Sequence, residues 1–112
     1  MAGMIDVMSL GQFQDELRRV ARFDASEPPA DALAAAVQKI RDNPAFSQSR
    51  LLTRVLRALT NQSGEFRRAE ISAFDTATLR IVIALMNAAR AGTNTRAEWD
   101  QAVCAADAAG DA

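Results

Sequence analysis

Histidine and tyrosine are absent from the 112 residues, and there is one cysteine. Histidine is the commonest general base near neutral pH and the commonest metal ligand, so its absence argues against acid–base catalysis and against a zinc site. The lone thiol, Cys104, has no histidine to activate it, and we expect a half-buried, small apolar side chain. No phosphate-binding loop or nucleophile motif is present. We therefore expect a protein that is not an enzyme and that uses no metal and no cofactor.

Long apolar runs are also missing. The longest strongly apolar stretch without a charge, 81–89, is too short to cross a hydrocarbon core about 30 Å thick. The N-terminus carries Asp6 where a secretory signal carries positive charge. A single cysteine fits a reducing compartment. We expect a cytoplasmic protein without a membrane span, and its small size and its richness in alanine and arginine, whose codons are GC-rich, favour a bacterial origin.

Charge of one sign is not in excess, because 13 basic residues face 14 acidic ones and the net charge is -1. The distribution is uneven, however. Residues 50–94 hold seven basic and three acidic side chains, whereas the segments before and after are both net acidic. The whole chain therefore has no general attraction for nucleic acid, and any such attraction must come from the basic middle.

The apolar residues recur with a period near 3.6, and strand-forming residues are few and scattered. This pattern predicts an all-α fold, a small orthogonal or bundle-like domain of four to six helices. We expect one domain over 1–112, with frayed ends at 1–7 and 108–112. The helices are predicted over about 9–23, 30–42, 44 or 49 to 62, 76–91 and 95–107, with a short helix or turn at 65–72.

Local signals fix several helix boundaries. Ser9 with Gln12, and Thr95 with Glu98, have the spacing of a capping box, which begins a helix. Pro29 and Pro44 suit first helical positions, the latter after Asn43 as cap. Ser72 or Asp75 caps the helix over 76–91. That helix is apolar on nearly every side, so we expect it to be the buried central helix.

An arginine face is the first candidate site. Arg50, Arg54 and Arg57 share one side of a helix whose other side is rich in leucine, and Arg67 and Arg68 follow in the next turn. Such a face can follow phosphates, because each neutralised phosphate releases counterions. It can instead pair with the acidic ends of its own chain or of a partner. We favour pairing, since no aromatic residue lies among the arginines to stack bases.

A helix-turn-helix is the sharpest nucleic-acid motif to test against this sequence. Ala88 and Gly92 have the spacing of its small residue and its turn glycine. The helix that would enter the groove carries Glu98 and Asp100, whose charges repel phosphate. We therefore expect no helix-turn-helix.

Two further patches are candidates for association. A narrow polar line, Thr76, Arg80 and Asn87, runs along the central helix, where a buried arginine needs an acidic partner. We expect this line to specify packing, although a docked subunit or ligand would also explain it. The apolar side of the first helix is expected to be only half covered, which favours a homodimer. Its association candidates are Phe13, Leu17 and Val20.

These observations predict a non-enzymatic helical module for protein–protein interaction, associating with itself or with another protein. The alternative is a small nucleic-acid-binding regulator that uses the Arg50, Arg54 and Arg57 face.

Overall fold

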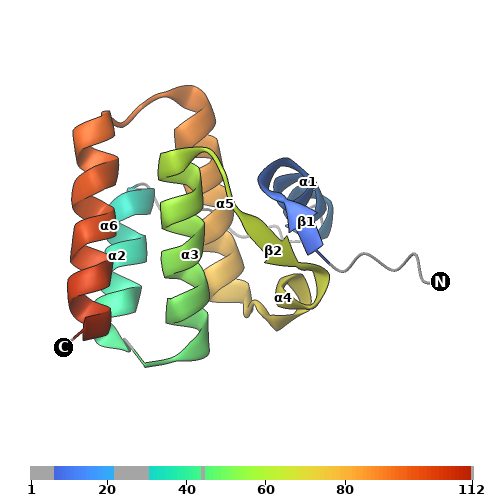
Figure 1. The fold of residues 1–112 in the computed structure, drawn as a ribbon, viewed down its shortest axis with the longest axis horizontal. Coiled ribbons are helices and arrows are strands. Elements are labelled where there is room, and N and C mark those ends of the chain that lie inside the picture. Colours follow the sequence, from blue (N-terminus) through green and yellow to red (C-terminus); the bar gives the residue numbers. More distant parts are fainter. Residues whose placement is uncertain (1–6, 22–30, 44, 112) are drawn as a thin grey trace.

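The computed structural model describes residues 7–21, 31–43 and 45–111. Within these ranges six helices and two short strands follow one another along the chain (Figure 1). Their bounds are β1 (Val7–Ser9), α1 (Leu10–Ala21), α2 (Ala32–Asp42), α3 (Ser47–Asn61), β2 (Glu65–Arg67), α4 (Arg68–Ala73), α5 (Thr76–Ala91) and α6 (Arg96–Asp111).

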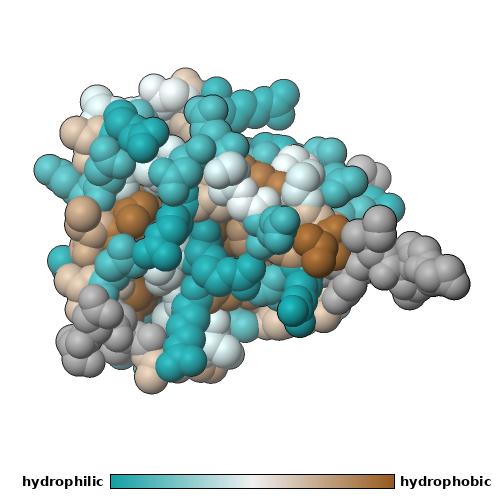
Figure 2. All heavy atoms as spheres, in the orientation of Figure 1, coloured by the Kyte–Doolittle hydropathy of each residue, from teal (hydrophilic) through white to brown (hydrophobic). Residues whose placement is uncertain are grey.

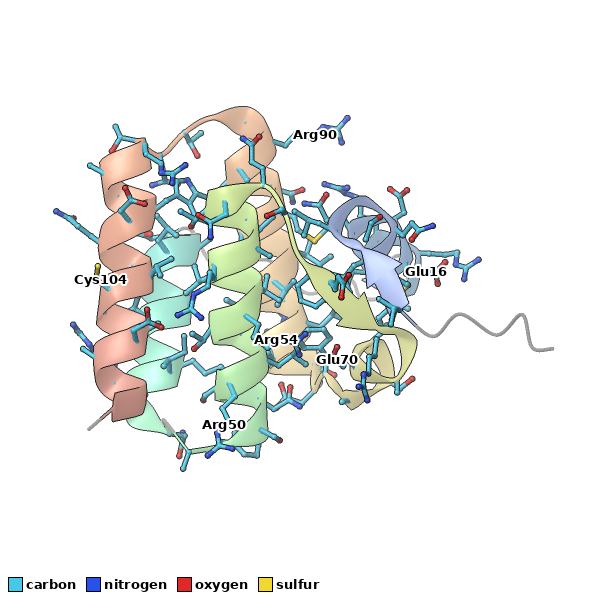
Figure 3. The ribbon with its side chains drawn as sticks, in the orientation of Figure 1. Glu16, Arg50, Arg54, Glu70, Arg90 and Cys104 are labelled. Atoms are coloured by element: carbon cyan, nitrogen blue, oxygen red, sulfur yellow. The ribbon has the colours of Figure 1, made fainter. Side chains whose placement is uncertain are left out.

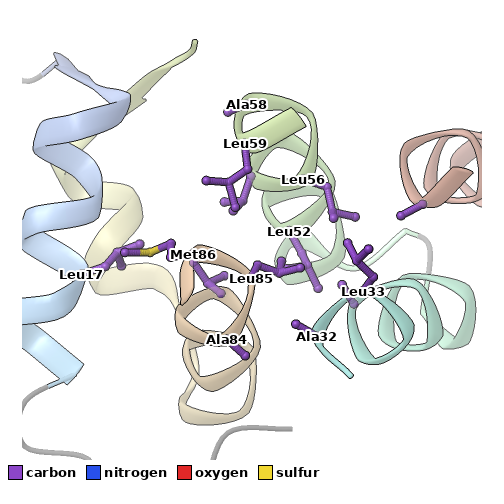
Figure 4. Close-up of a cluster of buried hydrophobic side chains, with 14 of the residues drawn as sticks. Leu17, Ala32, Leu33, Leu52, Leu56, Ala58, Leu59, Ala84, Leu85 and Met86 are labelled. Atoms are coloured by element: carbon purple, nitrogen blue, oxygen red, sulfur yellow. The ribbon is translucent and has the colours of Figure 1, made fainter. Parts of the chain in front are cut away.

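The helices pack in a row. α5 lies between α1 on one side and the α2–α3 pair on the other, and α6 packs against the far side of that pair (Figures 1 and 4). The predicted all-α, bundle-like fold is confirmed, and the predicted central helix over 76–91 contacts three other long helices. None of the described helices is long and apolar enough to cross a membrane.

The leucine face of α3 forms the middle of the core. The apolar residues on this face are all buried. They are Leu51, Leu52, Val55, Leu56 and Leu59. Of these, Leu52 and Leu56 are fully enclosed. They meet Leu85 of α5 and Leu33 of α2 in one apolar cluster (Figure 4). Burying a side chain of this size contributes roughly 1.5–3 kcal/mol relative to leaving it exposed, so this face is the main reason that the helices associate.

The helix caps follow the local sequence signals closely. At the start of α1 the Ser9 backbone N–H donates to Gln12 Oε1 at 3.1 Å and the Gln12 N–H donates back to Ser9 Oγ. Thr95 and Glu98 form the same reciprocal pair before α6. Asp75 accepts from the Thr78 N–H at 2.7 Å and begins α5. These three predicted starts are confirmed.

Two helix starts differ from the simplest prediction. α2 begins at Ala32 because the Asp31 carboxylate accepts from the Ala34 N–H, and Pro29 lies outside the described residues. α3 begins at Ser47, between the two predicted starts at 44 and 49. Asn43 does not cap α3 but ends α2, where its N–H donates to the Lys39 carbonyl, and Pro44 is likewise outside the described part.

A two-stranded ribbon is the element that the periodicity did not predict. β1 and β2 pair antiparallel, with Met8 opposite Phe66 and Val7 opposite Arg67. Residues 65–72, expected as a turn or a short helix, therefore divide into β2 and most of α4. Three residues are too few for an alternating pattern to register as a strand.

Aromatic rings attach this ribbon to the helices. The Phe13 ring of α1 stacks on Phe66 with centroids 3.8 Å apart and planes inclined by 10°. Phe74, after α4, approaches the same Phe13 ring at 6.1 Å. Met8 and Phe66, which lie opposite each other in the ribbon, are buried in the same cluster as Phe13.

The chain ends continue further than their composition suggests. α6 runs to Asp111, through residues 108–111 that we expected to fray. At the other end Val7, within the expected frayed segment, pairs with Arg67 in the ribbon. The remaining residues of the two expected frayed ends lie outside the described ranges.

Candidate functional site

Arg50, Arg54 and Arg57 lie exposed on the side of α3 opposite its leucines, as the helical spacing predicts. The Arg54 guanidinium forms an ion pair with Glu70 of α4 and donates to the Glu65 carbonyl oxygen at 3.0 Å (Figure 3). Its Cζ also lies 5.2 Å from the centre of the Phe66 ring, within the range of a cation–π contact. Arg54 is therefore held by three groups of its own chain.

Arg57 is held in the same way, through an ion pair with Asp107 of α6. Arg50 forms no ion pair within the described part of the chain. Two of the three arginines thus pair in cis with acidic residues, which is the arrangement that the sequence analysis favoured. Pairs as exposed as these contribute only about 0–1 kcal/mol each, so their main effect is on the surface charge.

The two arginines that follow the face have separate surroundings. Arg67 of β2 is exposed and shares a shallow surface hollow with Arg54 and Glu70. Arg68 begins α4, and its side chain lies outside the described atoms. The carboxylate of Glu70 therefore lines the same hollow as Arg54 and Arg67.

The predicted buried polar line is wrong for two of its three members. Thr76 and Asn87 of α5 are exposed, and only Arg80 is half-buried. Within the described ranges no helix covers the side of α5 that carries Thr76 and Asn87, which periodicity alone cannot establish. Near the start of α5, the buried polar side chains are instead those of Thr78 on α5 and Gln48 on α3.

The predicted association face of α1 is also wrong for two of its three members. Phe13 and Leu17 are fully buried, because the ribbon, α4 and α5 all pack against α1. Val20 alone is exposed, at 44%. Among the described residues, the other large apolar side chains that are exposed are Val7 and Phe46, which belong to different segments. Figure 2 accordingly shows small separate apolar patches on a mainly hydrophilic face.

Two further predictions concern Cys104 on α6 and the pairing of α6 with α5. Cys104, expected to be half-buried, is exposed on the outer side of that helix (Figure 3). α5 and α6 pack on opposite sides of the α2–α3 pair, so they do not form the compact helix pair of a helix-turn-helix. Among the described residues, no three histidine, cysteine or acidic side chains come together as metal ligands.

A surface groove between α1 and the C-terminal ends of α3 and α5 was not predicted. Its volume is about 370 Å³, near the lower end of the range of roughly 300–1,000 Å³ that is usual for ligand pockets. Figure 2 shows apolar side chains between α3 and α1, bordered by hydrophilic ones. The lining residues are Leu10, Gln14, Arg18, Leu59, Gln62, Met86, Ala89 and Arg90.

Local structure explains how the groove arises. Leu10, Gln14 and Arg18 are four residues apart, so they form one line along α1. Gln62 ends α3 in the left-handed conformation, with φ of 57°, and turns the chain away from the end of the helix. The four-residue spacing on α1 can be read from the sequence. Nothing in the sequence indicates that the ends of α3 and α5 face these residues.

The groove is basic at its rim. Arg18 and Arg90 lie in the last turns of α1 and α5, where the helix dipole favours a positive charge, and Arg90 projects from the end of α5 (Figure 3). Neither side chain forms an ion pair within the described ranges, and none of the described lining residues is acidic. Comparison with protein-family models, curated proteins and solved structures gives no match to this chain.

Proposed function

We propose that the protein is a non-enzymatic helical module that binds another protein, and that the groove between α1, α3 and α5 is its binding surface. The observation that carries the proposal is the lining of this groove. The apolar side chains of Leu10 and Ala89 lie beside Arg18 and Arg90, which form no ion pair within the described ranges. Protein interfaces combine an apolar centre with a polar rim in which arginine is enriched.

The arginine face of α3 supports a nucleic-acid function less well. Phosphate binding needs several cations that are free to replace counterions. Arg54 and Arg57 are already paired with Glu70 and Asp107, and these carboxylates would repel a nearby phosphate. We therefore assign the α3 face a structural role and the groove the binding role.

Position-specific photocrosslinking tests this proposal. Ala89 lines the groove and is exposed, so a benzoylphenylalanine placed there meets whatever protein binds. Ala77 is the matched control, because it is an exposed alanine of the same helix outside the groove lining. The full chain carrying either substitution is expressed in its host cells and irradiated.

We expect discrete crosslinked products from position 89 and none of the same mass from position 77. Mass spectrometry of each product identifies the crosslinked protein, and a product made of two copies of the 12.1 kDa chain would show self-association instead of binding to another protein. Absence of products at position 89, or the same products at both positions, contradicts the proposal.

A further inference from the structure

The chemistry of the groove restricts what kind of segment binds there, provided that the proposed function holds. Leu59 and Met86 form the floor and are only 8% and 1% exposed, so the apolar surface that solvent reaches is that of Leu10, which is half-buried, and of Ala89, which is exposed. A partner therefore has to offer at least one large apolar side chain to displace water from this surface. An entirely polar segment would leave the apolar side chains of the groove in contact with water, and its binding would gain little free energy.

The rim adds a requirement of charge. A partner that lies over the groove removes water from the Arg18 and Arg90 guanidinium groups, which is costly unless it supplies groups of opposite charge. The described lining supplies no carboxylate of its own. The amides of Gln14 and Gln62 are neutral, so they cannot balance the two positive charges.

We propose that the groove binds an acidic amphipathic peptide segment of a partner protein, with apolar side chains on the floor and aspartate or glutamate side chains against Arg18 and Arg90. Carboxylates suit arginine because its planar guanidinium binds them through two parallel hydrogen bonds. The neighbouring cation on α1, Arg19, is paired with Glu16 and takes no part.

A charge-reversal experiment tests this inference without knowledge of the natural partner. The probe is a display library of random peptides, selected separately against the wild-type chain and against Arg18→Glu with Arg90→Glu. The control variant is Arg41→Glu with Arg50→Glu, which changes the net charge equally at two exposed positions outside the groove. Circular dichroism checks that both variants keep the wild-type helical signal.

We expect the wild-type chain and the control variant to select peptides that combine large apolar residues with aspartate or glutamate. The groove variant should select lysine or arginine at the corresponding places. A synthetic peptide from the wild-type selection should bind the groove variant at least about tenfold more weakly in fluorescence anisotropy, and the control variant within about twofold.

Selection of peptides without acidic residues, failure to select any binder, or equal loss of affinity in both variants would overturn the inference. These outcomes are separate from failure of the proposed function. If a crosslinked partner contacts position 89 through a basic or neutral segment, the proposed interaction function stands and only the preference for acidic peptides is contradicted. If no crosslink forms, the proposed function itself is contradicted.

Discussion

At the scale of single residues, Gln48 joins the first turn of α3 to the junction between α4 and α5. Its side chain is 6% exposed, the Nε2 group donates to the Ala73 carbonyl, and Oε1 accepts from the Asp75 N–H at 3.0 Å. One amide thus satisfies a backbone acceptor and a backbone donor that would otherwise lie partly buried without partners. The sequence shows Gln48 only as a polar residue near a helix start.

Replacing Gln48 by methionine keeps the length of the side chain and removes both hydrogen bonds. We expect the free energy of unfolding to fall by roughly 1–3 kcal/mol, because the two backbone groups lose their partners. Urea denaturation at pH 7 measures this. Gln38→Met is the control, since Gln38 is exposed and bonds only Asp42; a comparable loss there would contradict the role given to Gln48.

Asp75 makes the stability depend on pH. Partial burial raises the pKa of this carboxyl, but the hydrogen bond from the Thr78 N–H, the Thr78 side chain and the charge of Lys39 together outweigh burial, so its pKa is lowered overall. A carboxyl whose pKa is lower in the folded than in the unfolded chain stabilises the fold above its unfolded pKa, about 3.9. That contribution is lost as the pH falls through the lower pKa of the folded state.

Asp75→Asn keeps a capping oxygen and removes the charge. We expect wild type to be the more stable of the two at neutral pH, with a difference that is constant down to about pH 5 and shrinks as the pH falls below about 4. Denaturant titrations at several pH values measure it. When Lys39→Gln is also present, Asp75→Asn should cost less free energy of unfolding at neutral pH. A cost of Asp75→Asn that grows on acidification would contradict the lowered pKa of Asp75.

At the scale of elements, the ribbon and α1 depend on the stack between Phe13 and Phe66. Phe66→Ala removes a side chain that is 2% exposed and leaves a cavity beside Phe13. We expect a loss of about 3–5 kcal/mol in the free energy of unfolding. Phe46→Ala is the matched control, because Phe46 is 48% exposed, and it should change stability by no more than about 0.5 kcal/mol.

Hydrogen exchange locates the effect of the Phe66 substitution. Faster exchange should appear first in α1 and β1, which the aromatic cluster holds against α4 and α5. If hydrogen exchange becomes equally faster in α2, α3 and α6, the ribbon and the other helices unfold as one unit.

At the scale of the whole molecule, the arginine face and the groove separate two kinds of basic surface. In the first, Arg54 and Arg57 are matched by carboxylates from α4 and α6, which lie 16 and 50 residues further along the chain. In the second, Arg18 and Arg90 have no such match among the described residues. The charges of the chain nearly cancel in total, yet acidic side chains match the basic ones at one surface and not at the other.

Replacing Arg50, Arg54 and Arg57 together by glutamine tests the role of the first surface. We expect a small loss of stability, about 0–1 kcal/mol for each lost pair, and no change in affinity for peptides that bind the groove. Thermal unfolding and fluorescence anisotropy measure the two effects. Micromolar binding of nucleic acid at 150 mM salt by the wild-type chain, abolished in this variant, would instead support the alternative function that the sequence left open.

The sequence by itself determined the five long helices, the caps that begin α1, α5 and α6, and the leucine face of α3. These features depend on residues three or four positions apart, such as Ser9 with Gln12 and Thr95 with Glu98, so local periodicity and capping chemistry are sufficient. The central position of α5 followed from its nearly uniform apolar surface. The separation of the arginines from the leucines on α3 follows from the same helical geometry.

Only the tertiary structure decided the rest, because each remaining feature joins residues distant in the chain. The ribbon pairs Val7–Ser9 with Glu65–Arg67, and this pairing buries Phe13 and Leu17, which the sequence offered as an association surface. The same packing places α1 against the ends of α3 and α5 and so forms the groove. Helical periodicity shows which residues share a face, but it does not show what that face meets.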